Sequence, residues 1–262
     1  MAPRTITPQE SELAQRLLAN ARRAMQQIAD YDQKKVDRLC QAIGWAAANP
    51  EAAERLANMS VDESGMGSRE PRRRAKVLGI LRDALRQKSM GIIEEIPEKG
   101  IVKYAKPAGV ICSLIPVTSP YITPIGIAIY AMKCKDAVIF SPHPSSRKTT
   151  TETVRLMRAA LKELGVPEDV LQCVETPSIP LANELMSICD LTIATGGPAM
   201  VRSPLAISSL ASGMLGRSMH CSTSAGAPSA ASAARISRTV SKVVRRLDGC
   251  GENTTAFLHL IA

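Results

Sequence analysis

The amino-terminal third of the chain has apolar residues at helical spacing. The stretch 7–10, Thr-Pro-Gln-Glu, combines a capping box with proline at the first helical position, so it predicts a helix start. The apolar residues that follow form one face of this helix: Leu13, Leu17, Ala21, Met25 and Ile28. Similar spacing predicts helices over 34–48, 50–60 and 70–89. The glycines of residues 63–68, ESGMGS, predict a turn before the last of them.

From residue 107 short apolar runs alternate with helical stretches. Four runs predict strands that are buried on both faces: 108–116, 137–141, 170–175 and 191–195. Helices are predicted between them over 122–134, 149–165 and 180–188. Such alternation is typical of βαβ units with right-handed crossovers. We therefore expect an α/β fold in which amino-terminal helices accompany a parallel-sheet, Rossmann-like dinucleotide-binding domain.

Polar turns follow the carboxyl ends of three predicted strands. They are Pro-Val-Thr-Ser-Pro (116–120), Ser-Pro-His-Pro (141–144) and Thr-Gly-Gly-Pro (195–198). Ligands bind beyond these ends in parallel sheets, and Gly196 and Gly197 would let a phosphate or a ribose approach the backbone. Each turn alone is also compatible with an ordinary connection, whereas three at one edge favour a nucleotide crevice. A GxGxxG fingerprint is absent, and the glycines of 63–68 join two helices instead of a strand and a helix.

Composition narrows the class of function. The chain has 262 residues, 45% of them hydrophobic, which is enough for a substantial core. Its net charge of +9 makes a polyanion partner worth testing. The basic residues that could bind such a partner are concentrated in the segments 72–76 and 203–262. Aromatic residues make up only 3%, so base stacking has few partners and we do not expect nucleic acid to be the ligand. The basic residues of 72–76 fit the solvated side of a helix whose buried stripe is Val77, Ile80, Leu81 and Leu85.

Cysteine usage and the first residues bear on the compartment. The seven cysteines, an odd number, show no CxxC spacing and no histidine cluster, so neither a zinc site nor a disulfide framework is indicated. The opening MAPRTITPQE lacks the apolar core of a signal peptide, and no apolar run approaches the length of a membrane span. We expect a reducing, cytoplasmic location without a metal or a membrane partner.

Four segments together resemble one enzyme family. They are ESGMGS (63–68), IPEKGIVKYAKPAGVICSLIPVTSPYITP (96–124), KDAVIFSPHPSS (135–146) and ATGGPAMVR (194–202). This ordered set resembles the CoA-acylating branch of the aldehyde dehydrogenase superfamily, and EEIPEKGIVKYAKP is most similar to its sulfoacetaldehyde dehydrogenase (acylating) type. The resemblance implies a domain that binds NAD or NADP without GxGxxG. It also implies oxidation of a small aldehyde to an acyl-CoA, coenzyme A as co-substrate, and a homo-oligomer.

The resemblance assigns roles to the residues of the three turns. It implies that Ile115, Pro116, Thr118 and Ser119 line the nicotinamide side, that Ser141, His143 and Pro144 lie near the adenosine ribose, and that Thr195, Gly196 and Gly197 lie near the pyrophosphate. A buried core histidine is the alternative for His143. The family usually has Asn where this chain has Ser119, and that Asn helps to stabilise the oxyanion of the thiohemiacetal. The serine hydroxyl is shorter, and losing one oxyanion donor costs on the order of a hundredfold in rate.

The resemblance ends near Arg202. The family continues with a glycine-rich segment and a second domain that carries the nucleophilic cysteine, whereas residues 203–262 are rich in Ser, Ala and Arg. We therefore divide the chain into an NAD(P)-binding domain with amino-terminal helices (1–202) and an atypical tail (203–262), as a shifted reading frame or a spliced remnant would give. Cys221 and Cys250 have no setting that would activate a thiol, so no nucleophilic cysteine is identified. Cys112 is expected inside a strand.

The tail carries expectations of its own. Few large apolar side chains recur in it, so ordering costs of about 1–2 kcal/mol per residue are poorly offset. We expect the tail to add little stability, to be cleaved first between about 203 and 230, and to form at most one helix, near 228–247. The sheet edge at 191–195 is then expected to stay exposed. Two alternatives to an acylating dehydrogenase remain: a catalytically inactive nucleotide-binding or assembly protein, and a nucleic-acid binder with a steep salt dependence.

Overall fold

The computed structural model describes residues 5–67, 69, 73–196 and 218–223. Its α-helices are α1 (Pro8–Gln27), α2 (Gln33–Ala48), α3 (Pro50–Ser64), α4 (Arg73–Leu85), α5 (Ile122–Cys134), α6 (Arg147–Glu163) and α7 (Ile179–Ile188). Its strands are β1 (Gly91–Ile96), β2 (Ile101–Ala105), β3 (Val110–Ile115), β4 (Ala137–Pro142), β5 (Leu171–Cys173), β6 (Leu191–Gly196) and β7 (Ser218–Thr223). Short 3-10 helices are η1 (Pro97–Lys99), η2 (Pro144–Ser146) and η3 (Glu168–Val170).

The central sheet is parallel, with strand order β5-β4-β3-β6-β7. The four strands predicted from apolar runs are all present, and β3 and β4 are buried along their whole length because helices cover both faces. The chain leaves β3 towards β4 and β5, and then returns to the other side of β3 with β6. The order in which successive strands join the sheet therefore reverses between β3 and β6, and the predicted α/β fold is confirmed.

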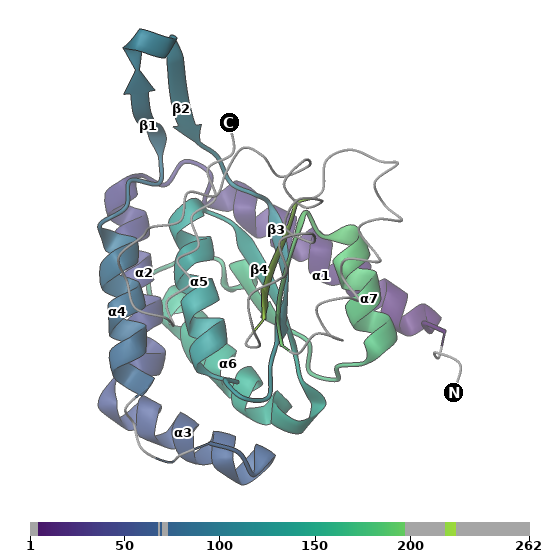
Figure 1. The fold of residues 1–262 in the computed structure, drawn as a ribbon. Helices are drawn as coiled ribbons and strands as arrows, with labels where there is room; N and C mark the ends of the chain where they lie inside the picture. The colour runs from purple at the N-terminus through teal and green to yellow at the C-terminus, as the bar shows by residue number, and fades with distance from the viewer. Residues whose placement is uncertain (1–4, 68, 70–72, 197–217, 224–262) are drawn as a thin grey trace.

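Helices pack on both faces of the sheet (Figure 1). Val110, Cys112 and Leu114 of β3 share a core with residues of α1 and α7. Ile111 and Ile115, on the opposite face of the same strand, lie in a larger core with residues of α2, α5 and α6. α3 packs against α6, and α4 packs against α2 and α5. The alternation of β3 side chains between two cores is the period of two that a strand buried on both faces requires.

The predicted start of α1 is confirmed in detail. The Glu10 N–H donates to Thr7 Oγ1 at 3.3 Å, and the Thr7 N–H donates to Glu10 Oε2 at 3.0 Å, which completes the capping box. Ala21 and Ile28 are fully buried on the face that was predicted to be apolar. Val77 of α4 is also fully buried, so the basic helix turns its apolar stripe to the core as expected.

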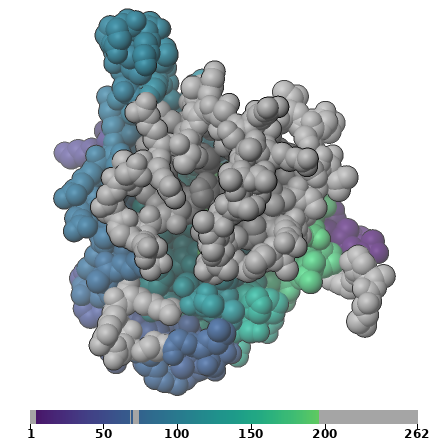
Figure 2. All heavy atoms as spheres, viewed as in Figure 1, coloured from purple at the N-terminus to yellow at the C-terminus, as the bar shows by residue number. Residues whose placement is uncertain are grey.

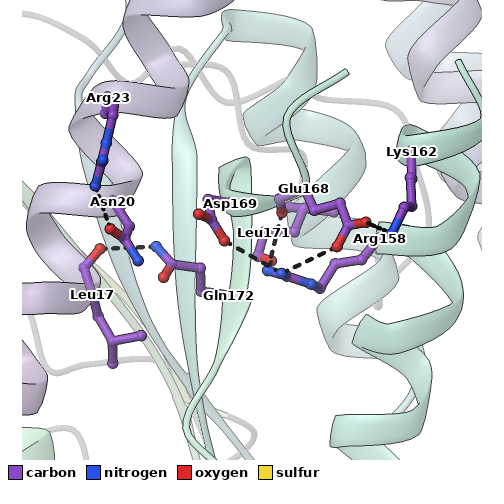
Figure 3. A network of polar contacts seen from close by, with 9 residues as sticks. All are labelled: Leu17, Asn20, Arg23, Arg158, Lys162, Glu168, Asp169, Leu171 and Gln172. Atoms are coloured by element: carbon purple, nitrogen blue, oxygen red, sulfur yellow. Dashed lines mark hydrogen bonds and ion pairs between the residues drawn. The ribbon is translucent and has the colours of Figure 1, made fainter. Parts of the chain in front are cut away.

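The β5 edge of the sheet is held to two helices by polar side chains, one from α6 and one from β5 itself (Figure 3). Arg158 of α6 donates to Leu171 O at 2.6 Å and to Glu168 O at 3.1 Å. Gln172 of β5 donates to Leu17 O of α1 at 2.8 Å. These bonds satisfy backbone carbonyls beside an edge strand, and they fasten the short β5 to both helical layers.

Residues 91–105 form a hairpin that the sequence pattern did not predict. β1 and β2 pair antiparallel, with an irregularity between Ile92 and Glu94, and they project from the body of the molecule (Figures 1 and 2). Every residue of the two strands is exposed or half-buried. Since neither face is buried, the alternation of apolar and polar residues that identifies a half-buried strand is missing.

The tail contributes a strand that was not expected. Residues 218–223 form β7, which pairs in parallel with β6 from Leu191↔Ser218 to Gly196↔Thr223. The prediction that the 191–195 edge stays exposed is therefore wrong, because pairing with β7 covers it. The helix expected near 228–247 lies outside the described residues, and the cleavage expected between 203 and 230 stays a prediction.

Candidate functional site

The carboxyl ends of β4, β3 and β6 lie side by side because these strands are neighbours in the sheet. The register places Leu114 opposite Ser141 on one side and opposite Ala194 on the other, so the turns that follow leave the sheet at the same level. The three turns singled out in the sequence thus begin at one edge. The strand order also reverses here, between β3 and β6, and such a point is the usual position of a ligand crevice in open α/β sheets.

Backbone hydrogen bonds organise the turn after β3. Ile115 O accepts a hydrogen bond from the His143 N–H at 3.1 Å, which ties this turn to the one after β4. The Ile115 side chain is fully buried in the larger core, and Pro116 is buried as well. Thr118 is exposed and Ser119 is half-buried. These last two residues therefore present the polar side chains of the turn that a ligand could meet.

Ser119 lies where the turn leads into α5. Its N–H donates to Pro116 O at 3.4 Å, and its carbonyl accepts from the Thr123 N–H at 3.2 Å. The Thr150 hydroxyl of α6 donates to Pro120 O at 2.9 Å, which holds the turn against the amino end of α6. The backbone of Ser119 is thus fixed on both sides. A role for its hydroxyl in stabilising an oxyanion stays a prediction.

The turn after β4 is organised around His143, the N-cap of η2. Nδ1 of His143 accepts from the Ser145 N–H at 3.2 Å, and its carbonyl accepts from the Ser146 N–H at 3.0 Å. The imidazole is half-buried and Pro144 is exposed, so the alternative of a core histidine is wrong. Ser141 is buried within β4. His143 and Pro144 are therefore the accessible members of the predicted ribose set.

The turn after β6 is described only at its start. Thr195 is half-buried, and Gly196 pairs with Thr223 of β7. Both belong to the same edge as the β3 and β4 turns. Gly197 lies outside the described residues, so its approach to a ligand stays a prediction.

Glu63 of α3, which sequence reasoning did not select, also reaches this region. Its carboxylate accepts hydrogen bonds from the Lys148 N–H and the Thr149 N–H, each at 2.8 Å, and from the Thr149 hydroxyl at 2.9 Å. These amides belong to the first turn of α6, whose N-cap Ser146 makes no side-chain capping bond. Because the partners of Glu63 lie 85 and 86 residues further along the chain, no local sequence signal could have identified it.

Four of the described cysteines have a shifted pKa, and each shift is upward, so none of these four thiols is activated. Burial raises the pKa of three thiols to about 12: Cys40, Cys134 and Cys173. Cys112 is fully buried inside β3, as predicted, and its pKa is raised by a hydrogen bond with Cys189 and then by burial. A raised pKa keeps a thiol protonated, and a protonated thiol is a poor nucleophile. Cys221 lies in β7, and Cys250 lies outside the described residues.

Metal-binding and membrane features are missing from the part of the chain that the structure describes. In that part no three His, Cys, Asp or Glu side chains are grouped so that they could hold a metal ion. None of the helices found there is both long enough and apolar enough to cross a membrane.

An open parallel sheet whose strand order reverses beside polar carboxyl-end turns defines a Rossmann-like α/β protein. Within this class the chain belongs to the aldehyde dehydrogenase family, whose model matches residues 4–207. It is 43% identical over 185 residues to the sulfoacetaldehyde dehydrogenase (acylating) of Bilophila wadsworthia, a match that covers 70% of this chain and 40% of that relative. The resemblance to the acylating branch that the four sequence segments indicated is confirmed.

Solved structures agree with this placement. The acetylating aldehyde dehydrogenase from Geobacillus thermoglucosidasius matches with a TM-score of 0.69 and 33% identity, covering 76% of this chain and 44% of that one. An engineered glycolyl-CoA reductase with bound NADP+ matches with a TM-score of 0.61 and 27% identity, covering 74% of this chain and 44% of that one. The chain thus spans about two fifths of the length of the relatives it matches.

Proposed function

We propose that this chain forms the dinucleotide-binding part of an acylating aldehyde dehydrogenase, which oxidises a small aldehyde to an acyl-CoA with NAD or NADP. The observation that carries the proposal is the meeting of the β3, β4 and β6 turns at one sheet edge in a chain of this family. The similarity to an acylating sulfoacetaldehyde dehydrogenase supports sulfoacetaldehyde as the first substrate to test.

The residues at this edge fit a dinucleotide. Thr118 and Ser119 would face its nicotinamide side, His143 its adenosine ribose, and the backbone at Gly196 its pyrophosphate. When bound, NAD(P) accepts the hydride that leaves the substrate. The contribution of the chain itself is orientation, because the bond from the His143 N–H to Ile115 O sets the spacing of two of the turns.

Binding of the cofactor is tested by calorimetric titration of the full chain with NAD and with NADP. Saturable binding of at least one dinucleotide is expected. Gly196→Val should abolish it, because a branched side chain at the end of β6 blocks approach to the backbone. Gly79→Val on α4 is the matched control, since an added Cβ there meets nothing within 4 Å. Absence of binding to the unaltered chain, or equal binding by Gly196→Val, contradicts the proposal.

A catalytically inactive nucleotide-binding protein is the second candidate. The high pKa values of the Cys40, Cys134 and Cys173 thiols favour it, because the acylating reaction needs a thiolate. Incubation of the chain with sulfoacetaldehyde, coenzyme A and NAD+ separates the two candidates. Production of NADH at 340 nm indicates an enzyme, whereas dinucleotide binding without turnover indicates the inactive protein.

We also propose a homo-oligomer that forms through the β1–β2 hairpin. Ile101, Val102 and Tyr104 are 44%, 47% and 49% exposed on this projection. An isolated two-stranded hairpin is only marginally stable in water, so a second copy packed against it would stabilise both. Light scattering after size exclusion should report an oligomer that Tyr104→Lys dissociates. A monomeric chain, or an oligomer unchanged by Tyr104→Lys, contradicts this.

We place the protein in the reducing cytoplasm. Five of the described cysteines are free thiols: Cys40, Cys112, Cys134, Cys173 and Cys189. Free thiols persist where glutathione and thioredoxin keep them reduced. Cell fractionation should recover the protein with cytoplasmic markers, and recovery from an exported fraction would contradict the placement.

A further inference from the structure

The amino end of α6 is capped by a residue from a different helix. Glu63 of α3 binds the Lys148 and Thr149 amides and the Thr149 hydroxyl, at 2.8 to 2.9 Å. The first N–H groups of a helix have no partner within the helix, and a phosphate is one of the anions that can bind them. In this chain a carboxylate already fills that position.

The capped end lies beside the turn that we assign to the adenosine ribose. α6 begins at Arg147, directly after η2, and α3 packs against both η2 and α6. Dinucleotide domains of the doubly wound type carry an acidic residue about twenty residues beyond the first βα turn for the ribose 2′-hydroxyl, or an arginine for a 2′-phosphate. Residues 141–146 contain no carboxylate. Glu63 brings one to their neighbourhood from outside the sheet.

We propose that Glu63 is a specificity-determining residue that makes the dinucleotide site prefer NAD to NADP. The inference rests on the proposed function, because it assumes that the β4 turn receives the adenosine ribose. Glu63 acts in two ways: it occupies the amides that a 2′-phosphate would use, and its negative charge repels that phosphate.

The groups around Glu63 indicate which way a substitution would shift the preference. Arg147 and Lys148 are exposed at the start of α6, and a phosphate attracts both. The Lys148 bond to Glu63 comes from its backbone N–H, so the side-chain ammonium is not consumed by this contact. Without Glu63 the start of α6 would combine free amides with two exposed cationic residues, and such groups together can bind a phosphate.

The test compares NAD and NADP affinities of the full chain by calorimetry. Glu63→Gln should raise the affinity for NADP relative to NAD by tenfold or more, because the charge is lost while the size of the side chain is kept. Arg55→Ala is the matched control. Arg55 of α3 pairs with Glu152 of α6 at 2.6 Å, so this variant loosens the same two helices without touching the capped amides. Its ratio of affinities should equal that of the unaltered chain.

The outcomes separate this inference from the proposed function. If the unaltered chain binds neither dinucleotide, the proposed function fails and this inference fails with it. If the unaltered chain binds NAD and Glu63→Gln leaves the ratio of affinities unchanged, Glu63 does not set the preference although the proposed function stands. Should Glu63→Gln fail to fold, Glu63→Asp decides the question. The shorter carboxylate should give an intermediate ratio, and an unchanged ratio in that variant overturns the inference.

Discussion

Asp136 gives a quantitative prediction about stability and pH. This aspartate follows α5 and is 5% exposed at the amino edge of the sheet, where its Oδ1 accepts a hydrogen bond from the Gly109 N–H at 2.9 Å. Burial raises the pKa of its carboxyl group from 3.8 to about 7, and the nearby carboxylate of Asp190 adds to the increase. The perturbation is Asp136→Asn, which removes the titration and keeps an oxygen that can accept the Gly109 bond.

The magnitude follows from linkage between protonation and folding. Because the pKa is higher in the folded state, the folded chain holds the proton more tightly than the unfolded chain. The free energy of unfolding therefore falls as the pH rises from about 4 to about 7, and the loss is complete above the folded pKa. A shift of about 3 units at 1.36 kcal/mol per unit corresponds to about 4 kcal/mol.

Urea denaturation at pH 5 and pH 8 tests this value. Asp136→Asn should be more stable than the unaltered chain by about 4 kcal/mol at pH 8, and the difference should shrink as the pH falls towards 4. Asp30→Asn exchanges an exposed aspartate and serves as the control. If Asp136→Asn shows the same dependence on pH as the unaltered chain, or is the less stable of the two at pH 8, the raised pKa assigned to the buried Asp136 carboxyl group is wrong.

Three further substitutions test the packing. Ser113→Ala should leave the free energy of unfolding unchanged or raise it by about 1 kcal/mol, and a thermal melt measures this. The reason is that Ser113 Oγ is buried without a hydrogen-bond partner among the described residues. A clear decrease would reveal a bond that the hydroxyl makes. Asp37→Ala should cost about 3 kcal/mol in urea denaturation, since it leaves the buried Lys133 ammonium unpaired. The pairing account requires that Asp37→Leu combined with Lys133→Met recover most of that loss. Gly109→Ala should cost about 2 kcal/mol or more by the same assay, because φ is +117° and the new Cβ would lie 2.7 Å from Asp190 Cγ. A variant as stable as the unaltered chain would show that the backbone relaxes there.

The elements that could be predicted from the sequence are those whose signals are local. The α1 start follows from Thr7 and Glu10, three residues apart, and β3 and β4 follow from uninterrupted apolar runs. β7 was not predicted, because Ser-Met-His-Cys-Ser-Thr contains only two apolar residues and no large aliphatic side chain, and its pairing depends on β6 as a template. The β1–β2 hairpin was missed for a related reason, since solvent reaches both of its faces.

The candidate site likewise has features that local sequence signals predict and features that depend on contacts between distant segments. The turn residues could be predicted because the apolar runs show where the strands end. The sheet order then places the β3, β4 and β6 turns together. What the sequence does not show is how those turns are held. The His143 bond to Ile115 and the Thr150 bond to Pro120 join segments that are 28 and 30 residues apart, and neither pair carries a spacing rule.

The amino-terminal helices are part of the machinery that forms the site. Asp37 of α2 pairs with Lys133 of α5, and the Cys40 thiol of the same helix donates to Ile129 O at 3.4 Å. These contacts hold α2 against the helix that follows the β3 turn. Glu63 of α3 then fixes the start of α6, the helix that follows the β4 turn. Each of the two turns that meet through His143 is therefore set by a sheet strand on one side and, through α5 or α6, by an amino-terminal helix on the other. A Rossmann-like sheet alone would supply the strand ends, but the position of the turns beyond them depends on residues 33–64.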